Sequence, residues 1–394
     1  MREVWRRLCR HEVALVVAVG LVSAVIQSVY FFETGRALEL RPAYPNSDAF
    51  FYWHAGWYRA FVDWDGGFAG AVMPNDPYVY LLALAHRVLG PSFSSLFALN
   101  SVFVVLCAIF VALAANVAYG RVAAWAAGLM TALCAPIVFF SGMVIKTVFV
   151  LFLLPVAIFA FFRFLRSGGL GGLFILVLSV GIATLERPNL GVASVVLVVV
   201  ATGRALWPRG ELPSRLARTK ACVTILLAIG FVWIIGGLES DRLEQDIVSP
   251  VGLNFYVGNV PEARGGHATV PGLRDDVVGH RLGSGRVLTE KLGYRPSRWE
   301  QSEYWFEKTI DRYREEPLSY SGLLARKVVA LFSRETYGLP EQFGVWRWHR
   351  SALAMAFVDF SVVLSFVAVT LASGAQSVNV LRPGFCSAVR RCTP

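Results

Sequence analysis

Acidic and basic side chains that are capable of catalysis stand at the ends of long apolar segments. Asp48 opens an aromatic stretch, Lys146 follows an apolar run, and Glu186 and Arg187 form an adjacent pair before Pro188. A carboxylate is able to act as a general base that takes a proton from a hydroxyl or amine, and a guanidinium fork binds phosphate through two parallel bonds. One base and two cations on one face fit the transfer of a group from a donor whose leaving group is a lipid phosphate.

Asp48 and a second carboxylate, Asp76, also have structural explanations. Ser47 is a good helix N-cap and Asp48 suits the positive end of a helix dipole, so a short helix is predicted to begin there, either as an interfacial aromatic belt or as the mount of a catalytic base. Asp76 directly precedes Pro77, which is the usual arrangement of an N-cap before proline at the first helical position.

The cations have alternatives as well. Lys146 either snorkels to the interface or meets an anion, because a lysine at this depth is costly otherwise. Glu186 and Arg187 either neutralise each other in a tight turn or present the guanidinium to a phosphate, with Glu186 holding it in place.

Composition indicates which solvent surrounds these residues. The chain of 394 residues is 56 % hydrophobic and 16 % charged, with a mean hydropathy of +0.55. A water-soluble domain of this size cannot hide that much apolar surface, so we predict an all-α polytopic membrane protein. About eight segments are long enough to cross a hydrocarbon layer of roughly 30 Å. They are residues 12–32, 94–119, 122–141, 143–162, 170–185, 189–206, 221–238 and 351–373.

The distribution of Lys and Arg predicts the orientation, because short loops on the cytoplasmic side are enriched in them. With the basic N-terminus in the cytoplasm, the Arg-rich connections around residues 121, 163–166, 204–220 and 382–391 all fall on the same side. We therefore predict a multi-pass protein of the cytoplasmic (inner) membrane with its candidate site on the extracytoplasmic face. The formal net charge of +10 follows from this topology and from anionic lipid, and no pattern typical of nucleic-acid binding is present.

This topology divides the chain into three parts. Residues 1–238 form a transmembrane catalytic core that includes a long outer loop at 33–93, and residues 239–320 form a small, loop-rich periplasmic cap segment in which Trp299 to Tyr313 has helical spacing. Residues 321–394 contain the last span and a basic cytoplasmic tail, preceded by an amphipathic helix from Tyr320 to Leu331 that is expected to lie in the interface.

Five motifs in order resemble the GT-C class of membrane glycosyltransferases, and within it the bacterial relatives of the dolichyl-phosphate-mannose protein mannosyltransferases and of the lipid A aminoarabinose transferase. The resemblance covers about residues 10–350. The motifs are S-D-A-F-F-Y-W-H-A-G from Ser47, N-D-P-Y-V-Y-L-L from Asn75, A-P-I-V-F-F-S-G-M-V-I-K from Ala135, E-R-P-N from Glu186, and G-L-N-F-Y-V-G-N-V-P-E-A-R-G from Gly252.

The resemblance implies an inverting transferase that takes a sugar from a polyprenyl-phosphate donor to a glycan, lipid or protein acceptor. Asp48 matches the catalytic loop carboxylate and Arg187 a donor-phosphate contact, with Lys146 beside it; no cofactor or divalent metal is required. The sugar and acceptor are expected to contact Asp76, Glu186, Asn189, Asn254, Tyr256 and Asn259, the last three in a loop that resembles a cap above the sugar.

Two departures from the pattern stand out. Lys146-Thr147 replaces an acid that several relatives carry, and the chain has one apolar span beyond the cap where relatives usually have more, which implies a shortened C-terminal part. A permease or lipid flippase is the main alternative, although its ionisable groups usually lie near the bilayer midplane, whereas here Asp359 is the main charge within a span. A wall-polymer ligase or polymerase with a polyprenyl-diphosphate donor shares the outer-face geometry.

Overall fold

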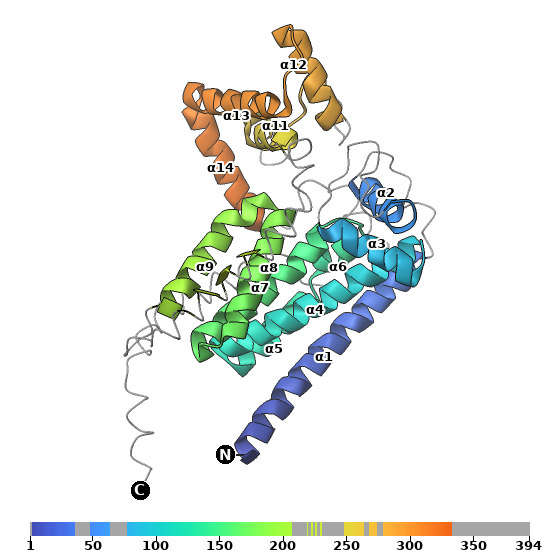
Figure 1. The fold of residues 1–394 in the computed structure, drawn as a ribbon, viewed down its shortest axis with the longest axis vertical. Helices are drawn as coiled ribbons and strands as arrows, with labels where there is room; N and C mark the ends of the chain where they lie inside the picture. The colour runs from blue at the N-terminus through green and yellow to red at the C-terminus, as the bar shows by residue number, and fades with distance from the viewer. Residues whose placement is uncertain are drawn as a thin grey trace.

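The structure, a computed structural model, consists of helices joined by short connections in the part of the chain that it describes. The described residues are 2–35, 48–63, 77–206, isolated positions between 219 and 230, 248–263, 268–273 and 279–332. Figure 1 shows two groups of helices: a long bundle, and beyond one end of it a smaller group that we call the cap.

The bundle, together with its end nearer to the cap, contains nine of the helices that the structure describes. They are α1 (Arg2–Gly35), α2 (Asp48–Phe61), α3 (Pro77–Leu89), α4 (Phe93–Tyr119), α5 (Arg121–Ala132), α6 (Ala135–Ser141), α7 (Thr147–Ser167), α8 (Leu170–Glu186) and α9 (Gly191–Leu206). The cap contains α11 (Val248–Asn259), α12 (Ser284–Leu292), α13 (Arg298–Glu315) and α14 (Pro317–Phe332), with short turns of helix at Pro261–Ala263 and Gly279–Gly283. A third short turn, Pro188–Leu190, joins α8 to α9 in the bundle.

Three described helices are long and apolar enough to cross a membrane. They cover His11–Glu33, Phe93–Tyr119 and Thr147–Ser167, and two shorter apolar helices cover Leu170–Glu186 and Gly191–Gly203. These five segments agree with the predicted class of an all-helical membrane protein. The predicted span at 351–373 lies outside the described residues, and that at 221–238 is described only at isolated positions.

The predicted continuous span at 122–141 is wrong. α5 ends at Ala132 and α6 begins at Ala135, with Leu133 and Cys134 between them. Pro136, in the first turn of α6, lacks the N–H that would bond the preceding turn, and its ring would clash with the carbonyl of Ala132 in a continuous helix. The apolar pattern did not reveal this break because residues on both sides of it are hydrophobic.

α4 is at the centre of the bundle and packs against α1, α5 and α7. Gly128 on α5 allows a close approach, because a Cβ there would lie 2.8 Å from the Cβ of Ala112. Small residues at helix contacts are typical of membrane bundles, in which close packing replaces the hydrophobic effect. The outward side of α1 is also apolar, with Val13, Leu21 and Val25 each about 60 % exposed (61 %, 60 % and 58 %), as expected for a helix that faces lipid.

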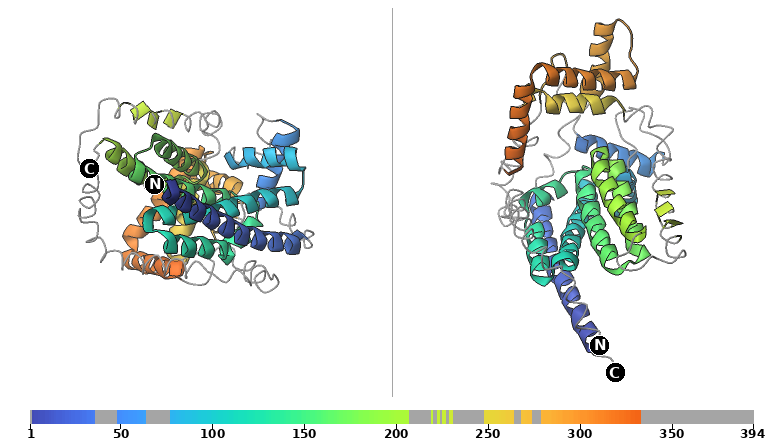
Figure 2. Two further views of the ribbon diagram at one scale, coloured as in Figure 1. Left: turned by 90° about the horizontal axis from the view of Figure 1, so that it is seen from below. Right: turned by 90° about the vertical axis from the view of Figure 1, so that its left-hand side faces the viewer.

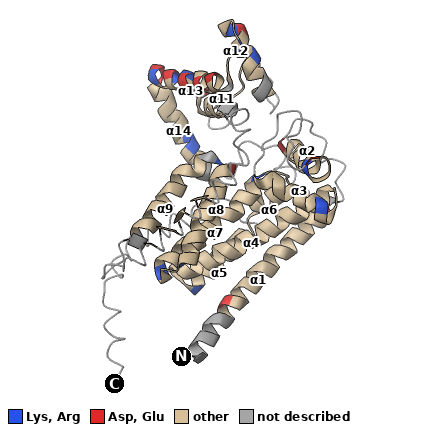
Figure 3. Cartoon of the chain, in the orientation of Figure 1, with Lys and Arg blue, Asp and Glu red and all other residues tan. Residues whose placement is uncertain are grey.

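Charged residues are concentrated at the helix ends and on the cap, and the bundle helices are almost free of them along their length (Figure 3). The N-terminal end of α1 lies at the end of the bundle away from the cap, whereas α2, α3 and α6 lie at the end nearer to it (Figures 1 and 2). This arrangement agrees with the predicted grouping of the candidate residues at one end of the bundle.

The orientation predicted from the Lys and Arg distribution can be tested by labelling. In a version of the chain without its six natural cysteines, we expect Cys at Asp63 or Glu303 to react with a membrane-impermeant thiol reagent applied to intact cells. Cys at Ser167, the exposed last residue of α7, should react only after the cells are opened. Labelling of Ser167→Cys in intact cells would contradict the predicted topology.

The cap has a hydrophobic core of its own. Leu253 and Val257 of α11 pack with Leu288 of α12 and Trp305 of α13. The expected loop from Asn254 to Asn259 is therefore wrong, since these residues lie within α11. The i, i+4 spacing of Leu253 and Val257 explains why this stretch is helical: it places both on one side, against α13.

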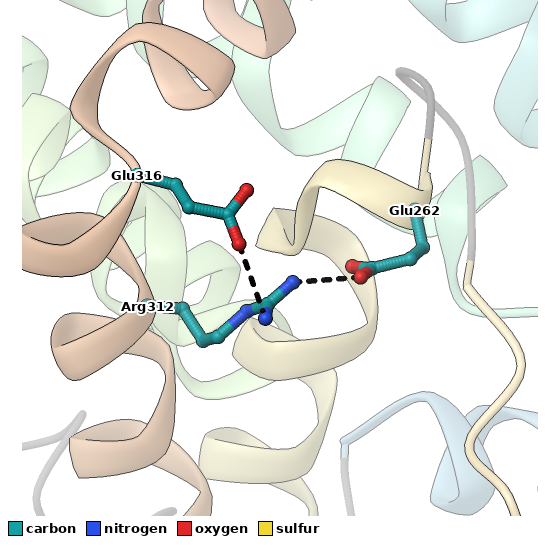
Figure 4. A network of polar contacts seen from close by, with 3 residues as sticks. All are labelled: Glu262, Arg312 and Glu316. Atoms are coloured by element: carbon teal, nitrogen blue, oxygen red, sulfur yellow. Dashed lines mark hydrogen bonds and ion pairs between the residues drawn. The ribbon is translucent and has the colours of Figure 1, made fainter.

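The two helices predicted in the cap region are confirmed. Trp299 to Tyr313 lies within α13, which begins with a capping box between Ser297 and Glu300. Tyr320 to Leu331 lies within α14. Arg312 of α13 pairs with Glu262 in the Pro261–Ala263 turn, at 2.7 Å, and with Glu316, the residue before α14, at 3.2 Å (Figure 4).

One side of α14 is apolar and exposed. Tyr320 and Leu323 are buried, whereas Leu324 and Val328 are 56 % and 55 % exposed. In Figure 1, α14 crosses the direction of α1 and α4 rather than following it. These features agree with the expectation that α14 lies in the membrane interface.

The position of α14 gives a second prediction. A bimane fluorophore on Val328→Cys or Leu324→Cys should be quenched by brominated phospholipid in nanodiscs and protected from aqueous iodide, because that side is expected to contact acyl chains. The same fluorophore on Ser319→Cys, which is also exposed, should show the opposite pattern. Strong iodide quenching at Val328 would place α14 in water.

Candidate functional site

Glu186 caps a helix that is distant in the sequence. It is the last residue of α8, it is fully buried, and its Oε1 accepts a hydrogen bond of 2.7 Å from the backbone N–H of Tyr78. Tyr78 is the second residue of α3, where backbone N–H groups have no acceptor within the helix. A carboxylate at this positive helix end is favourable, so Glu186 fixes the start of α3 against the end of α8.

Arg187 points to another helix. It is exposed, and its Nη2 donates a hydrogen bond of 2.8 Å to Oγ1 of Thr147, the first residue of α7. Thr147, rather than Glu186, therefore holds the guanidinium. Since Lys146 immediately precedes Thr147, the two candidate phosphate-binding cations stand at the adjacent ends of α7 and α8.

A buried amide connects α3 to the turn before Lys146. Asn100 on α4 is fully buried; its Oδ1 accepts from the hydroxyl of Tyr78 at 2.9 Å, and its Nδ2 donates to the carbonyl of Met143 at 2.8 Å. Asn100 and Tyr78 were not predicted as site residues. The available signal was the position of Asn100, because an amide inside a long apolar helix is costly unless it is hydrogen-bonded.

Asp48 stands in the first turn of α2 and is exposed. Tyr52 follows one turn later on the same side of the helix, and its ring centroid lies 5.6 Å from that of Tyr78. α2 is thus packed on the same tyrosine whose backbone is bonded to Glu186. The predicted helix at this position is confirmed.

One apolar cluster lies beneath all of these helix ends. It includes buried residues from α2, α3, α4, α6, α7 and α8, such as Phe51, Tyr78 and Phe149. Ala49, Ile145 and Leu190 pack against it, and each is a close sequence neighbour of a candidate polar residue. The cluster therefore connects the segments that carry Asp48, Lys146 and Arg187.

The other predicted residues are placed differently. Asn189 is exposed in the short turn Pro188–Leu190, next to Arg187, and Asp76 lies outside the described residues. Asn254, Tyr256 and Asn259 lie on α11 in the cap. The contacts described above connect none of these three to Glu186 or Arg187.

Asn259 serves the packing of the cap. Its Nδ2 donates to the carbonyl of Phe255 at 2.9 Å, and its Oδ1 accepts from Nζ of Lys327 on α14 at 2.6 Å. Burial lowers the pKa of Lys327 below its ordinary value. Both polar atoms of Asn259 thus have partners within the cap. Asn254 is exposed, and Tyr256 packs against Trp305 with 4.9 Å between ring centroids.

Comparison with models of known protein families gives no match, and comparison with curated proteins gives no significant match either. Within the described ranges, no three His, Cys, Asp or Glu side chains lie close enough together to hold a metal ion.

The buried contact of Glu186 gives a third prediction. Glu186→Gln keeps an acceptor for the N–H of Tyr78 but loses the charge at the α3 N-terminus, so we expect it to lower the stability of the chain by about 1–2 kcal/mol. Thermal unfolding in nanodiscs measures this effect, with the exposed Glu307→Gln on α13 as the matched control. Equal melting of both variants would show that the charge of Glu186 does not stabilise α3.

Proposed function

We propose that this chain is an inverting membrane glycosyltransferase that moves a sugar from a polyprenyl-phosphate donor to an acceptor on the extracytoplasmic side. The observation that supports it best is the convergence on one apolar cluster of segments bearing a carboxylate and two cations. The resemblance of the five motifs to the GT-C class adds to this support. The finer description of the bundle as a GT-C-like core is part of the proposal.

The proposed reaction is a single displacement. Asp48 takes the proton of the acceptor hydroxyl or amine, and the freed electron pair forms a bond to the anomeric carbon of the donor sugar. The bond between that carbon and the phosphate oxygen breaks at the same time. The polyprenyl phosphate leaves with its charge facing Arg187 and Lys146.

Each supporting residue has a place in this scheme. Thr147 orients the guanidinium of Arg187 through their 2.8 Å hydrogen bond. Glu186 and Asn100 act on positions rather than on the reacting atoms, because they hold the start of α3 and the turn before Lys146. A site at the end of apolar helices suits a donor whose lipid part stays in the bilayer.

The experiment uses the purified full chain in liposomes with labelled polyprenyl-phosphate sugars and an acceptor-containing membrane extract. We expect release of polyprenyl phosphate together with labelled product of inverted anomeric configuration. Movement of intact donor between leaflets without cleavage would favour the flippase. Use of a polyprenyl-diphosphate donor alone would favour the ligase or polymerase.

A further inference from the structure

Two ammonium groups in the cap surround one aromatic ring. Nζ of Lys308 on α13 lies 4.9 Å from the ring centroid of Tyr256, 5.0 Å from that of Trp305 and 6.0 Å from that of Tyr304. Nζ of Lys291, in the last turn of α12, donates a hydrogen bond to the hydroxyl of Tyr304 and lies 5.0 Å from the centroid of that ring. The hydrogen bond therefore holds the Lys291 ammonium at the hydroxyl edge of Tyr304, and cation–π contacts hold the Lys308 ammonium near Tyr256 and Trp305, on the side of the same tyrosine.

The frame behind these lysines is rigidly packed. Trp305 is 2 % exposed, and its Nε1 donates to Oγ of Ser284 at 2.8 Å, which ties α13 to α12. Gly252 brings α11 against α13 so closely that a Cβ there would lie 1.8 Å from the carbonyl oxygen of Ser302. The three helices also lie together in Figures 1 and 2. Fixed cations lose little conformational entropy when they bind a ligand.

No carboxylate of the described residues forms an ion pair with either of these lysines. Several basic side chains of the cap have ion pairs: Arg286 with Glu290, Arg312 with Glu262 and Glu316, and Arg314 with Asp311. Among the residues that the structure describes, Lys291 and Lys308 have none. Two like charges around one ring repel each other, so an anion bound between them would lower the energy of the site.

We propose that Lys291 and Lys308, with the half-buried rings of Tyr256 and Tyr304, bind an anionic saccharide, that is, a sugar that bears a carboxylate or phosphate group. The ammonium groups match the anion, and the exposed parts of the tyrosine rings match the apolar C–H surface of a sugar. Assignment of this saccharide as the acceptor rests on the proposed function. The binding itself does not depend on that function.

The test measures binding of tetragalacturonic acid to the full chain in nanodiscs by isothermal titration calorimetry, with its fully methyl-esterified form as the uncharged probe. We expect the acid to bind and the ester to bind at least about tenfold more weakly, since each charge-assisted bond contributes about 1.5–3 kcal/mol. Lys308→Met and Lys291→Met should each weaken binding of the acid by about tenfold, and Lys308→Arg should retain most of it.

Arg286→Met is the matched control, because this arginine lies on α12 and is paired with Glu290. It should change the affinity by less than about twofold. Circular dichroism and thermal unfolding show whether each variant is folded, and Lys308→Arg provides the comparison if Lys308→Met is not. Equal binding of acid and ester, or equal loss in the Arg286 variant, would overturn the proposal.

Two further measurements, of vesicle binding and of sugar transfer, distinguish failure of this site from failure of the proposed function. If the chain binds phosphatidylglycerol vesicles through these lysines but not the saccharide, the site is a lipid contact and the saccharide proposal is overturned. If the chain transfers sugar to a neutral acceptor at a rate that neither lysine variant changes, the proposed function is supported but these lysines are not its acceptor site. If saccharide binding depends on the two lysines but no sugar transfer is detected, the binding site is supported and the proposed function is not.

Discussion

Asp48→Asn is expected to lower the rate of sugar transfer by about 10²–10⁴-fold, which is the usual effect of losing a general base. Asn has nearly the same shape and still suits the first turn of α2, so expression and donor binding should stay close to normal. The measurement is the single-turnover rate in liposomes at saturating donor, with donor binding measured separately. A rate near that of the unmodified chain would remove Asp48 from the mechanism.

Asp63→Asn is the matched control for this variant. Asp63 is also exposed and lies just beyond the other end of α2, in the same predicted outer loop. Its replacement removes one negative charge close to α2 without touching the first turn of that helix. If both variants lose activity equally, the effect is one of overall charge near α2 and not of a base at Asp48.

The sequence predicts the positions of helices well where a local signal, such as apolar spacing or an N-cap, is clear. α13 was predicted from its apolar spacing, and α2 from Ser47 and Asp48, because capping chemistry and periodicity both act within a few residues. The break between α5 and α6 was missed although Pro136 was visible, because the hydrophobic segment continues through it. Hydropathy identifies a buried segment but not its interruptions.

The site was only partly predictable for a different reason. Its polar residues were found because charges are rare in apolar segments, but their partners depend on contacts between distant parts of the chain. Glu186 was expected to hold its neighbour Arg187, whereas it bonds the N–H of Tyr78, 108 residues away. Asn254 to Asn259 were expected to form a loop near the sugar, whereas packing on Trp305 makes that stretch a helix of the cap.

Arg187→Ala is expected to lower kcat/KM for the polyprenyl-phosphate donor by about 10–100-fold, since a charged hydrogen bond contributes about 1.5–3 kcal/mol. Arg187→Lys should recover only part of this loss, because an ammonium is a point charge and cannot form the two parallel bonds of a guanidinium with phosphate. Both variants should keep their thermal stability, since Arg187 is exposed. Steady-state transfer at varied donor concentration measures the effect.

Thr147→Val distinguishes the two possible roles of Arg187. This change removes the 2.8 Å hydrogen bond between α7 and α8 but leaves the guanidinium in the site. If Arg187 binds phosphate, Thr147→Val should cost no more than about tenfold in kcat/KM, the effect of losing one orienting bond, and so less than Arg187→Ala. If Arg187 only joins the two helices, both variants should lower the unfolding temperature together and affect transfer equally. Equal losses of unfolding temperature and of kcat/KM in the two variants would contradict the proposal that Arg187 binds the phosphate leaving group. The proposed electrostatic stabilisation of that group would then lose its main residue.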